Sequence, residues 1–239
     1  MGDRIGKKRR LRAFRWGALG ALLAGAAAAA GWAVWTVDRY LAQPLPADFV
    51  PLSQVSREMR DATVAMEDGS FYRHGGFDFD AIHRAAVSNY QRGRVVRGGS
   101  TITQQLAKNL FLEPDRTLWR KIREALLAAE LERRLTKDQI LERYMNVVDY
   151  GLGQRGVGAA ARGYFGKLPA DLTLAESAMM VGLVPDPPQR TLSRSRAESA
   201  RKTALLRVAY WFRHRYSSAD LETARSTPLE ALAFDRPGH

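Results

Sequence analysis

The chain has 239 residues, no cysteine and a net charge of +12, and 46% of its residues are hydrophobic. This length suits one ordinary domain with tails, and the lack of cysteine excludes disulfides and thiolate metal sites. Most of the excess charge lies at the two ends, because residues 16–189 carry twenty basic and nineteen acidic side chains. This distribution argues against a nucleic-acid partner and favours contact of the ends with anionic membrane lipids.

The N-terminal region predicts a membrane anchor. Residues 1–15 form a basic tail with seven Lys or Arg, and residues 16–37 are 22 consecutive uncharged residues. A helix of this length spans about 30 Å, the thickness of the hydrocarbon core, and the basic tail before it places the N-terminus inside. A cleaved signal peptide is the alternative, since residues 28–30 are all alanine. The apolar run continues past these alanines, which favours a retained anchor.

Residues 38–52 contain three prolines and predict a short extended stalk. A helix is expected next, and it places Glu67 at its C-terminal end, at the edge of a cleft. Its apolar positions recur on one face: Val55, Met59, Ala62 and Met66.

The remaining elements are also predicted to be helical. Residues 69–80 indicate a loop, residues 80–90 a helix, and Ser100 is expected to cap a helix over residues 101–112. Thr117 or Asp115 is expected to begin a helix that ends near Leu135, and Thr136 caps another that ends near Val148. Further helices are expected at residues 172–184 and 195–216, and strand signals are scarce apart from residues 94–97. The fold class is therefore mainly α.

Three short strings carry candidate chemistry, and the first is EDGSFYRH at residues 67–74. A carboxylate at a helix end that faces an apolar cleft has its pKa raised by desolvation, which suits a proton acceptor at neutral pH. Taken alone, Glu67 and Asp68 would more often be a solvated helix end.

The second string is GGSTITQQLAKN at residues 98–109. Two glycines before a capped helix start can bind an anion, because free N–H groups and the helix dipole point the same way. Gln104, Gln105 and Lys108 then lie one to two turns into the helix, on a shared face. An ordinary loop with an N-cap is the alternative for the first four residues.

The third string is RKIRE at residues 120–124. Arg120 and Lys121 lie four and three residues before Glu124, so the three share a helix face. These cations could neutralise a diphosphate, or they could form a plain surface ion pair with Glu124 worth a few tenths of a kcal/mol.

These strings, followed by blocks at residues 146–167 and 172–185, resemble the peptidoglycan glycosyltransferases of glycosyltransferase family 51, in particular their monofunctional biosynthetic members. The resemblance implies a lysozyme-like domain over residues 53–190 with a small membrane-associated lobe. It also implies an activity: lipid II is polymerised into β-1,4-linked glycan strands with inversion, and undecaprenyl diphosphate is released. The implied location is the bacterial inner membrane, with the catalytic domain on the outer side.

The resemblance assigns roles to particular residues. It makes Glu67 the general base and Glu124 a second catalytic carboxylate, which orients the cations or helps to bind a divalent ion such as Mg²⁺ or Mn²⁺. No Asp-x-Asp metal motif supports that ion. The positions expected to bind substrate are Ser100, Thr101, Gln104, Gln105, Lys108, Asn109, Arg116 and Lys121. Those expected to support the site are Asp68, Phe71 and His74.

The C-terminal extension, residues 191–239, is basic and helical, and indicates either a solvated helix or a helix that lies on the membrane surface. No penicillin-binding domain is expected, since a Ser-x-x-Lys match at Ser199 has no Lys-Thr-Gly after it. Two alternative functions stay open: a lytic enzyme that cleaves glycan, and a non-enzymatic membrane scaffold. The expected partners are lipid II, the nascent glycan strand, membrane lipids and other cell-wall synthesis or division proteins.

Overall fold

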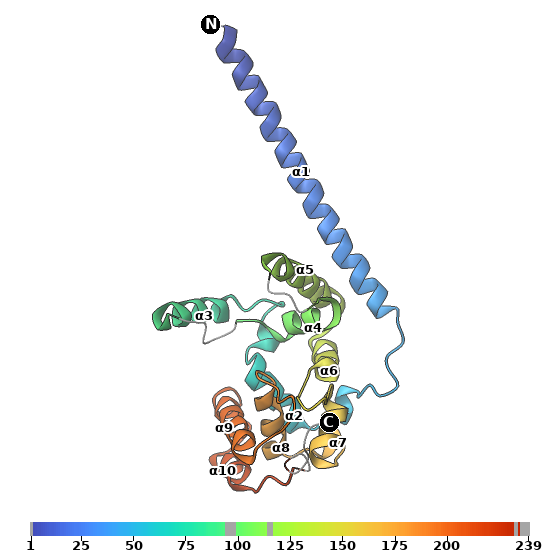
Figure 1. Cartoon of the computed structure of the whole chain (residues 1–239), viewed down its shortest axis with the longest axis vertical. Coiled ribbons are helices and arrows are strands. Elements are labelled where there is room, and N and C mark those ends of the chain that lie inside the picture. Colours follow the sequence, from blue (N-terminus) through green and yellow to red (C-terminus); the bar gives the residue numbers. More distant parts are fainter. Residues whose placement is uncertain (1, 94–98, 114–116, 232–233, 235–239) are drawn as a thin grey trace.

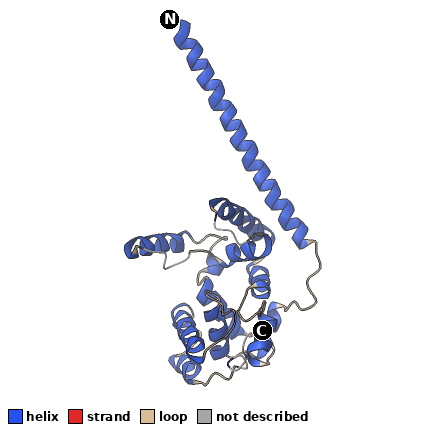
Figure 2. Cartoon of the chain, viewed as in Figure 1, coloured by secondary structure: helices blue, strands red, loops and turns tan. Residues whose placement is uncertain are grey.

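The computed structural model describes residues 2–93, 99–113, 117–231 and 234, with side chains from residue 16 onward. Within these ranges every extended regular element is a helix (Figure 2), and the one β-type pairing is an isolated bridge between Asp149 and Arg155. The prediction of a mainly α fold is confirmed. The short strand pieces considered at residues 94–97 lie outside the described residues.

The first helix, α1 (Gly2–Leu41), projects far from the rest of the molecule (Figure 1). Its segment Trp16–Leu41 is long and apolar enough to cross a membrane. The first four residues of the expected stalk, 38–41, are helical, so the non-helical connection is shorter than predicted. The last turns of α1 contact α5 (Leu118–Arg134), where Ala33 and Val37 are buried and Arg134 pairs with Asp38 at 2.5 Å.

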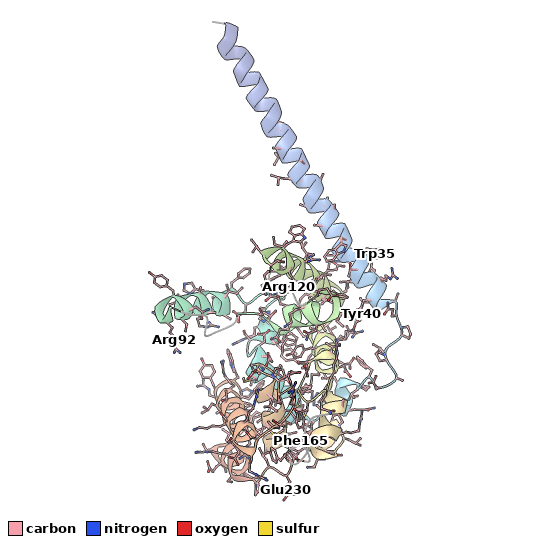
Figure 3. All side chains as sticks on the ribbon, in the orientation of Figure 1. Trp35, Tyr40, Arg92, Arg120, Phe165 and Glu230 are labelled. Carbon is pink, nitrogen blue, oxygen red and sulfur yellow. The ribbon has the colours of Figure 1, made fainter. Side chains whose placement is uncertain are left out.

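Among the described residues, other segments come close to α1 near its C-terminal end, where Figure 3 labels Trp35 and Tyr40. The Tyr40 ring meets the Phe111 ring edge-on, with centroids 5.4 Å apart. Helix α1 is therefore held to the body through its last turns.

The helix that carries Glu67 is α2 (Arg57–Glu67), which follows a short 3₁₀ turn at Leu52–Gln54. The Ser56 side chain caps α2 by accepting a hydrogen bond from the Met59 N–H. Of the apolar face predicted from the sequence, Val55, Met59 and Ala62 are buried and Met66 is half-buried. Glu67 is the last residue of the helix, as predicted.

The middle of the chain forms α3 (Phe79–Arg92), α4 (Ile102–Phe111), α5 and α6 (Lys137–Val147), with a 3₁₀ turn at Phe71–Arg73. Thr117 and Thr136 cap α5 and α6, as the sequence indicated. Ser100 was the wrong choice for α4. Thr101 is its cap, because the Thr101 and Gln104 side chains form a reciprocal capping box.

The C-terminal part adds α7 (Val157–Phe165), a 3₁₀ turn at Pro169–Asp171, α8 (Leu174–Leu183), α9 (Arg194–Trp211) and α10 (Ser218–Ser226). The sequence did not predict α7, which begins after Gly156 at a φ of 84°. A Cβ at Gly156 would lie 2.7 Å from the Asn146 carbonyl oxygen, so this close approach requires glycine.

Helix α9 packs against α8 and α2, and its inner face, including Ala197, Ala204 and Val208, is buried. A fully solvated helix is not what the structure shows, whereas contact of the exposed face with a membrane surface stays a prediction for this helix. It is part of the body that carries Glu67.

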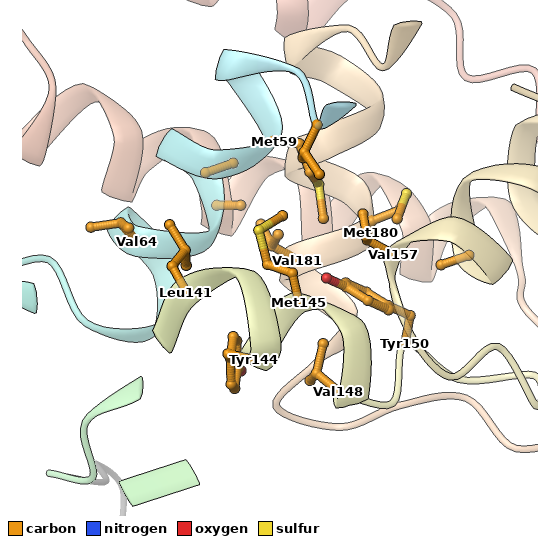
Figure 4. Packing of buried hydrophobic residues seen from close by; sticks show 14 of the residues in the cluster. Met59, Val64, Leu141, Tyr144, Met145, Val148, Tyr150, Val157, Met180 and Val181 are labelled. Carbon is orange, nitrogen blue, oxygen red and sulfur yellow. The ribbon is translucent and has the colours of Figure 1, made fainter. Parts of the chain in front are cut away.

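The core lies between α2, α6, α7 and α8. Figure 4 shows Met145 and Tyr150 beside Met180 and Val181, all of them almost fully buried. Burying one such large apolar side chain contributes about 1.5–3 kcal/mol. This packing fixes the C-terminal end of α2, and Glu67 with it.

Candidate active site

Glu67 is partly enclosed where α2 ends. Its Oε2 atom accepts a hydrogen bond of 2.8 Å from the Gln105 side-chain amide, and its buried Oε1 atom has no hydrogen-bond partner among the described residues. Desolvation raises the pKa of the Glu67 carboxyl, and the Gln105 hydrogen bond and the charges of Lys108 and Arg207 offset part of that rise. The direction agrees with the shift expected from the sequence, and a raised pKa makes the carboxylate a better proton acceptor.

A second hydrogen bond fixes the amide that holds Glu67. The Tyr144 hydroxyl, on α6, donates to Gln105 Oε1 at 3.2 Å, and Tyr144 is fully buried. Because the amide oxygen accepts from Tyr144, the amide nitrogen is turned toward Glu67. The local sequence around Tyr144 shows only a buried helix position, so this link could not be read from it.

Asp68 joins the loop after α2 to the start of α4. Its carboxylate pairs with His74 Nε2 at 3.0 Å and accepts the Ile102 N–H at 3.1 Å. The protein's own carboxylate thus occupies the place of the anion that was expected at this helix start. Phe71 is fully buried, and the Lys137 ammonium lies 4.5 Å from its ring centroid.

Two residues expected to bind substrate also hold the start of α4 together. Thr101 and Gln104 are both buried in the capping box, and the Thr101 hydroxyl also donates to the Gly76 carbonyl oxygen at 2.7 Å. Thr101 also lines the cleft beside Glu67, and substrate contact by these two side chains stays a prediction. Gln105, one residue on, faces Glu67.

Glu124 is buried between two cations of α5. The Arg120 guanidinium lies 3.0 Å from one of its oxygens, and the Lys121 ammonium pairs with the other. Lys121 also donates to Ser100 Oγ at 3.0 Å and so joins α5 to the start of α4 (Figure 3 labels Arg120). Because both oxygens of Glu124 are paired, the carboxylate orients cations and is not a free acid or base.

The other predicted substrate-binding residues are found in different surroundings. Lys108 is exposed on α4, close enough to Glu67 to lower its pKa. Asn109 is half-buried, and its carbonyl oxygen accepts a hydrogen bond from Arg155. Arg116 lies outside the described residues.

A cleft of about 730 Å³ opens beside Glu67. The segment from Ala65 to Ser70, the start of α3 and the start of α4 line it, together with three residues of α9: Arg207, Tyr210 and Trp211. These three residues belong to the segment 191–239, which was expected to be an extension outside the domain. Their spacing of three and four residues places them on one helix face, but the spacing does not predict which cleft that face meets. A smaller hollow of about 180 Å³ lies between the stalk and α6 and α7.

Neither candidate position for a divalent ion offers free ligand atoms. Asp68, His74 and Asp78 hold their nearest ligand atoms within 4.8 Å of one another. However, Asp68 already pairs with His74 and Ile102, and Asp78 accepts from Ser70 and Ala81. The oxygens of Glu124 are similarly paired. These residues therefore do not fit an Mg²⁺ or Mn²⁺ site as they stand.

A carboxyl of raised pKa on a cleft wall, with cations nearby, defines a site for acid–base chemistry on a polar substrate. Residues 37–209 match the Transglycosylase family, and the chain therefore belongs to this family. The resemblance inferred from the motifs is confirmed. The matched segment extends past the expected domain of residues 53–190 at both ends.

Individual relatives agree with this assignment. A biosynthetic peptidoglycan transglycosylase from Nitrosospira multiformis is 41% identical over 66% of this chain and 69% of its own. One from Azoarcus sp. is 48% identical over 58% of this chain and 60% of its own. Penicillin-binding protein 1A from Aquifex aeolicus is 48% identical over 61% of this chain, but the match covers 21% of that protein. A crystal structure of penicillin-binding protein 1A from Haemophilus influenzae covers 79% of this chain at 23% identity and a TM-score of 0.45, which adds nothing to the assignment.

Proposed function

We propose that the protein is a biosynthetic peptidoglycan glycosyltransferase that polymerises lipid II into β-1,4-linked glycan strands. The observation that carries this proposal is the Glu67 carboxyl, with its raised pKa, between Gln105 and the cleft. The names of the relatives support the substrate class, and Lys108 and Lys121 supply positive charge on the side of α4 and α5.

In the proposed reaction Glu67 accepts the proton of the acceptor sugar's 4-hydroxyl while that oxygen attacks C1 of the donor sugar. The C1–O bond to the diphosphate breaks, C1 inverts, and undecaprenyl diphosphate leaves with the bonding electrons. Negative charge builds on the departing diphosphate, and preorganised cations stabilise it without solvent reorganisation. In this proposal Lys108 and Lys121 supply these cations, and the family resemblance adds Arg116. The contacts of Lys121 with Glu124 and Ser100 support its part, since they hold its ammonium group in place.

The proposed location is the inner membrane, with α1 as a retained single-pass anchor. The seven basic residues before the span favour a cytoplasmic N-terminus, which leaves the cleft on the outer side. The contact between the last turns of α1 and α5 supports a cleft held near the membrane, where a lipid-linked donor is found. Other cell-wall synthesis or division proteins are proposed partners only by the resemblance.

The test is incubation of the detergent-solubilised full chain with labelled lipid II, with glycan length read on a gel. Long glycan from the wild type is expected, and none from Glu67→Gln. Glu58→Gln is the matched control, because Glu58 lies in the first turn of the same helix and pairs with Arg57.

Two other outcomes would overturn the proposal. Shortening of pre-formed glycan without synthesis would favour a lytic enzyme, which also needs an enclosed glutamic acid. Binding of lipid II with neither reaction would favour a membrane scaffold.

A further inference from the structure

Helix α9 brings an aromatic pair to the cleft that holds Glu67. Arg207, Tyr210 and Trp211 lie at spacings of three and four residues, so they share one face of α9, and all three line the cleft. The match to the transglycosylase family ends at residue 209. Tyr210 and Trp211 therefore lie just past the segment that defines the family.

Trp211 is held in place from several sides. Its indole ring lies against Gly69, where any Cβ would overlap the ring, and Gly69 is only two residues after Glu67. The Arg73 guanidinium lies 5.3 Å from the ring centroid, and the Tyr210 ring meets it edge-on, with centroids 5.1 Å apart. Aromatic and cation–π contacts of this kind fix the ring orientation. The wall of the cleft beside Glu67 is thus a rigid aromatic surface.

Tyr210 leaves most of its ring open to the solvent, with 72% of the residue exposed. The same cleft is lined by charged side chains from other segments, among them Arg73, Asp80 and Arg84. An exposed ring beside hydrogen-bonding side chains suits a ligand with an apolar face and polar edges. A pyranose ring has this character, since its C–H groups form a face and its hydroxyls form the rim.

We propose that Tyr210, supported by Trp211 and Arg73, forms a subsite for a sugar ring of the glycan strand on the α9 side of Glu67. The helices α4 and α5, which carry the cations proposed for the diphosphate, lie apart from α9 (Figure 1), since α9 packs on α8 and α2 whereas α4 packs on α5 and α6. The charges of Lys108 on α4 and of Arg207 on α9 both lower the pKa of Glu67. In this arrangement the diphosphate lies by α4 and α5 and the sugar ring lies by α9, where Arg73 and Arg207 of the same cleft are available to its hydroxyls. This inference rests on the proposed function for the identity of the strand.

The test measures binding of a labelled, uncross-linked peptidoglycan glycan strand to the detergent-solubilised full chain by fluorescence anisotropy. Loss of a stacking ring in Tyr210→Ala is expected to weaken binding about tenfold. Tyr210→Phe keeps the ring and is expected to stay within about twofold of the wild type. Leu206→Ala is the matched control, because Leu206 is exposed one turn earlier on α9 and does not line the cleft.

The same variants are then assayed for polymer made from lipid II, where Tyr210→Ala is expected to give shorter strands. Wild-type affinity and product length in Tyr210→Ala would overturn the subsite, as would an equal loss in Leu206→Ala, which would point to a membrane-facing role for this surface. Strand binding that depends on Tyr210, in a protein that makes no polymer, would contradict the proposed function and leave the subsite standing.

Discussion

Two carboxylates enclosed by the protein, Glu67 at the end of α2 and Glu124 in α5, differ in how they are paired. Glu67 accepts one hydrogen bond from a neutral amide and has a buried oxygen without a partner among the described residues. Glu124 has a cation on each oxygen, Arg120 and Lys121. A carboxylate left underpaired keeps a high proton affinity, whereas one that is fully paired organises its partners. We therefore propose proton transfer for the first and the positioning of cations for the second.

The largest expected effect comes from Glu67→Gln. Loss of a general base is expected to lower the polymerisation rate by about 10²–10⁴-fold. Stability should move the other way. The folded-state pKa is raised, so the ionised carboxylate costs stability once the pH exceeds the unfolded-state pKa, and the amide removes that cost. A melting temperature at pH 7 that rises while activity is lost would confirm both parts, whereas substantial activity would remove Glu67 from the role of base.

Glu124→Gln is expected to have the next largest effect. It leaves Arg120 and Lys121 without their anion, so we expect a loss of about 1–3 kcal/mol of stability together with a fall in kcat. Glu130→Gln is the matched control, because Glu130 is also buried on α5 and pairs with two arginines, Arg133 and Arg134. Urea unfolding should show similar losses for both variants. Equal losses of activity as well would make the Glu124 cluster a purely structural ion pair.

Local sequence signals predicted the helices that carry Glu67 and Glu124. The apolar face of α2 placed Glu67 at a helix end, and Thr117 and Thr136 marked the starts of α5 and α6, because caps act within one turn. The spacing of RKIRE brought Arg120 and Lys121 to Glu124 for the same reason.

Contacts between distant segments could not be predicted in this way. Asp68 takes the N–H of Ile102, 34 residues away, and so occupies the expected anion site. The Trp211 ring contacts Gly69, which is far from it in the sequence. Because of this contact, α9 lines the cleft and is not a separate tail. Helix α7 was missed because it begins at a glycine and not at a side-chain cap.

Gln105→Ala sharpens the assignment of Glu67 through pH. The Gln105 amide stabilises the charged carboxylate and so lowers the pKa of Glu67 against the larger effect of burial. Without this hydrogen bond the pKa of Glu67 should rise further. As the pH is lowered, Glu67 would then become protonated earlier, and activity would begin to fall at a higher pH than in the wild type. The acid limb of the kcat–pH profile should therefore move upward. A limb that stays in place would show that another group controls it.

Tyr144→Phe is expected to have the smallest effect, and it tests the hydroxyl that orients Gln105. Removing it leaves the amide oxygen without the partner that turns the nitrogen toward Glu67, at a cost of about 1 kcal/mol. We expect the acid limb to move in the same direction as in Gln105→Ala but by less, with partial loss of kcat. Tyr216→Phe is the control, because Tyr216 is also buried and its hydroxyl donates to Asp61. If Tyr216→Phe lowers the melting temperature as much as Tyr144→Phe but leaves the pH profile unchanged, the effect of Tyr144 on the base is separate from its effect on stability. A shift of the pH profile in both variants would refute the role of Tyr144.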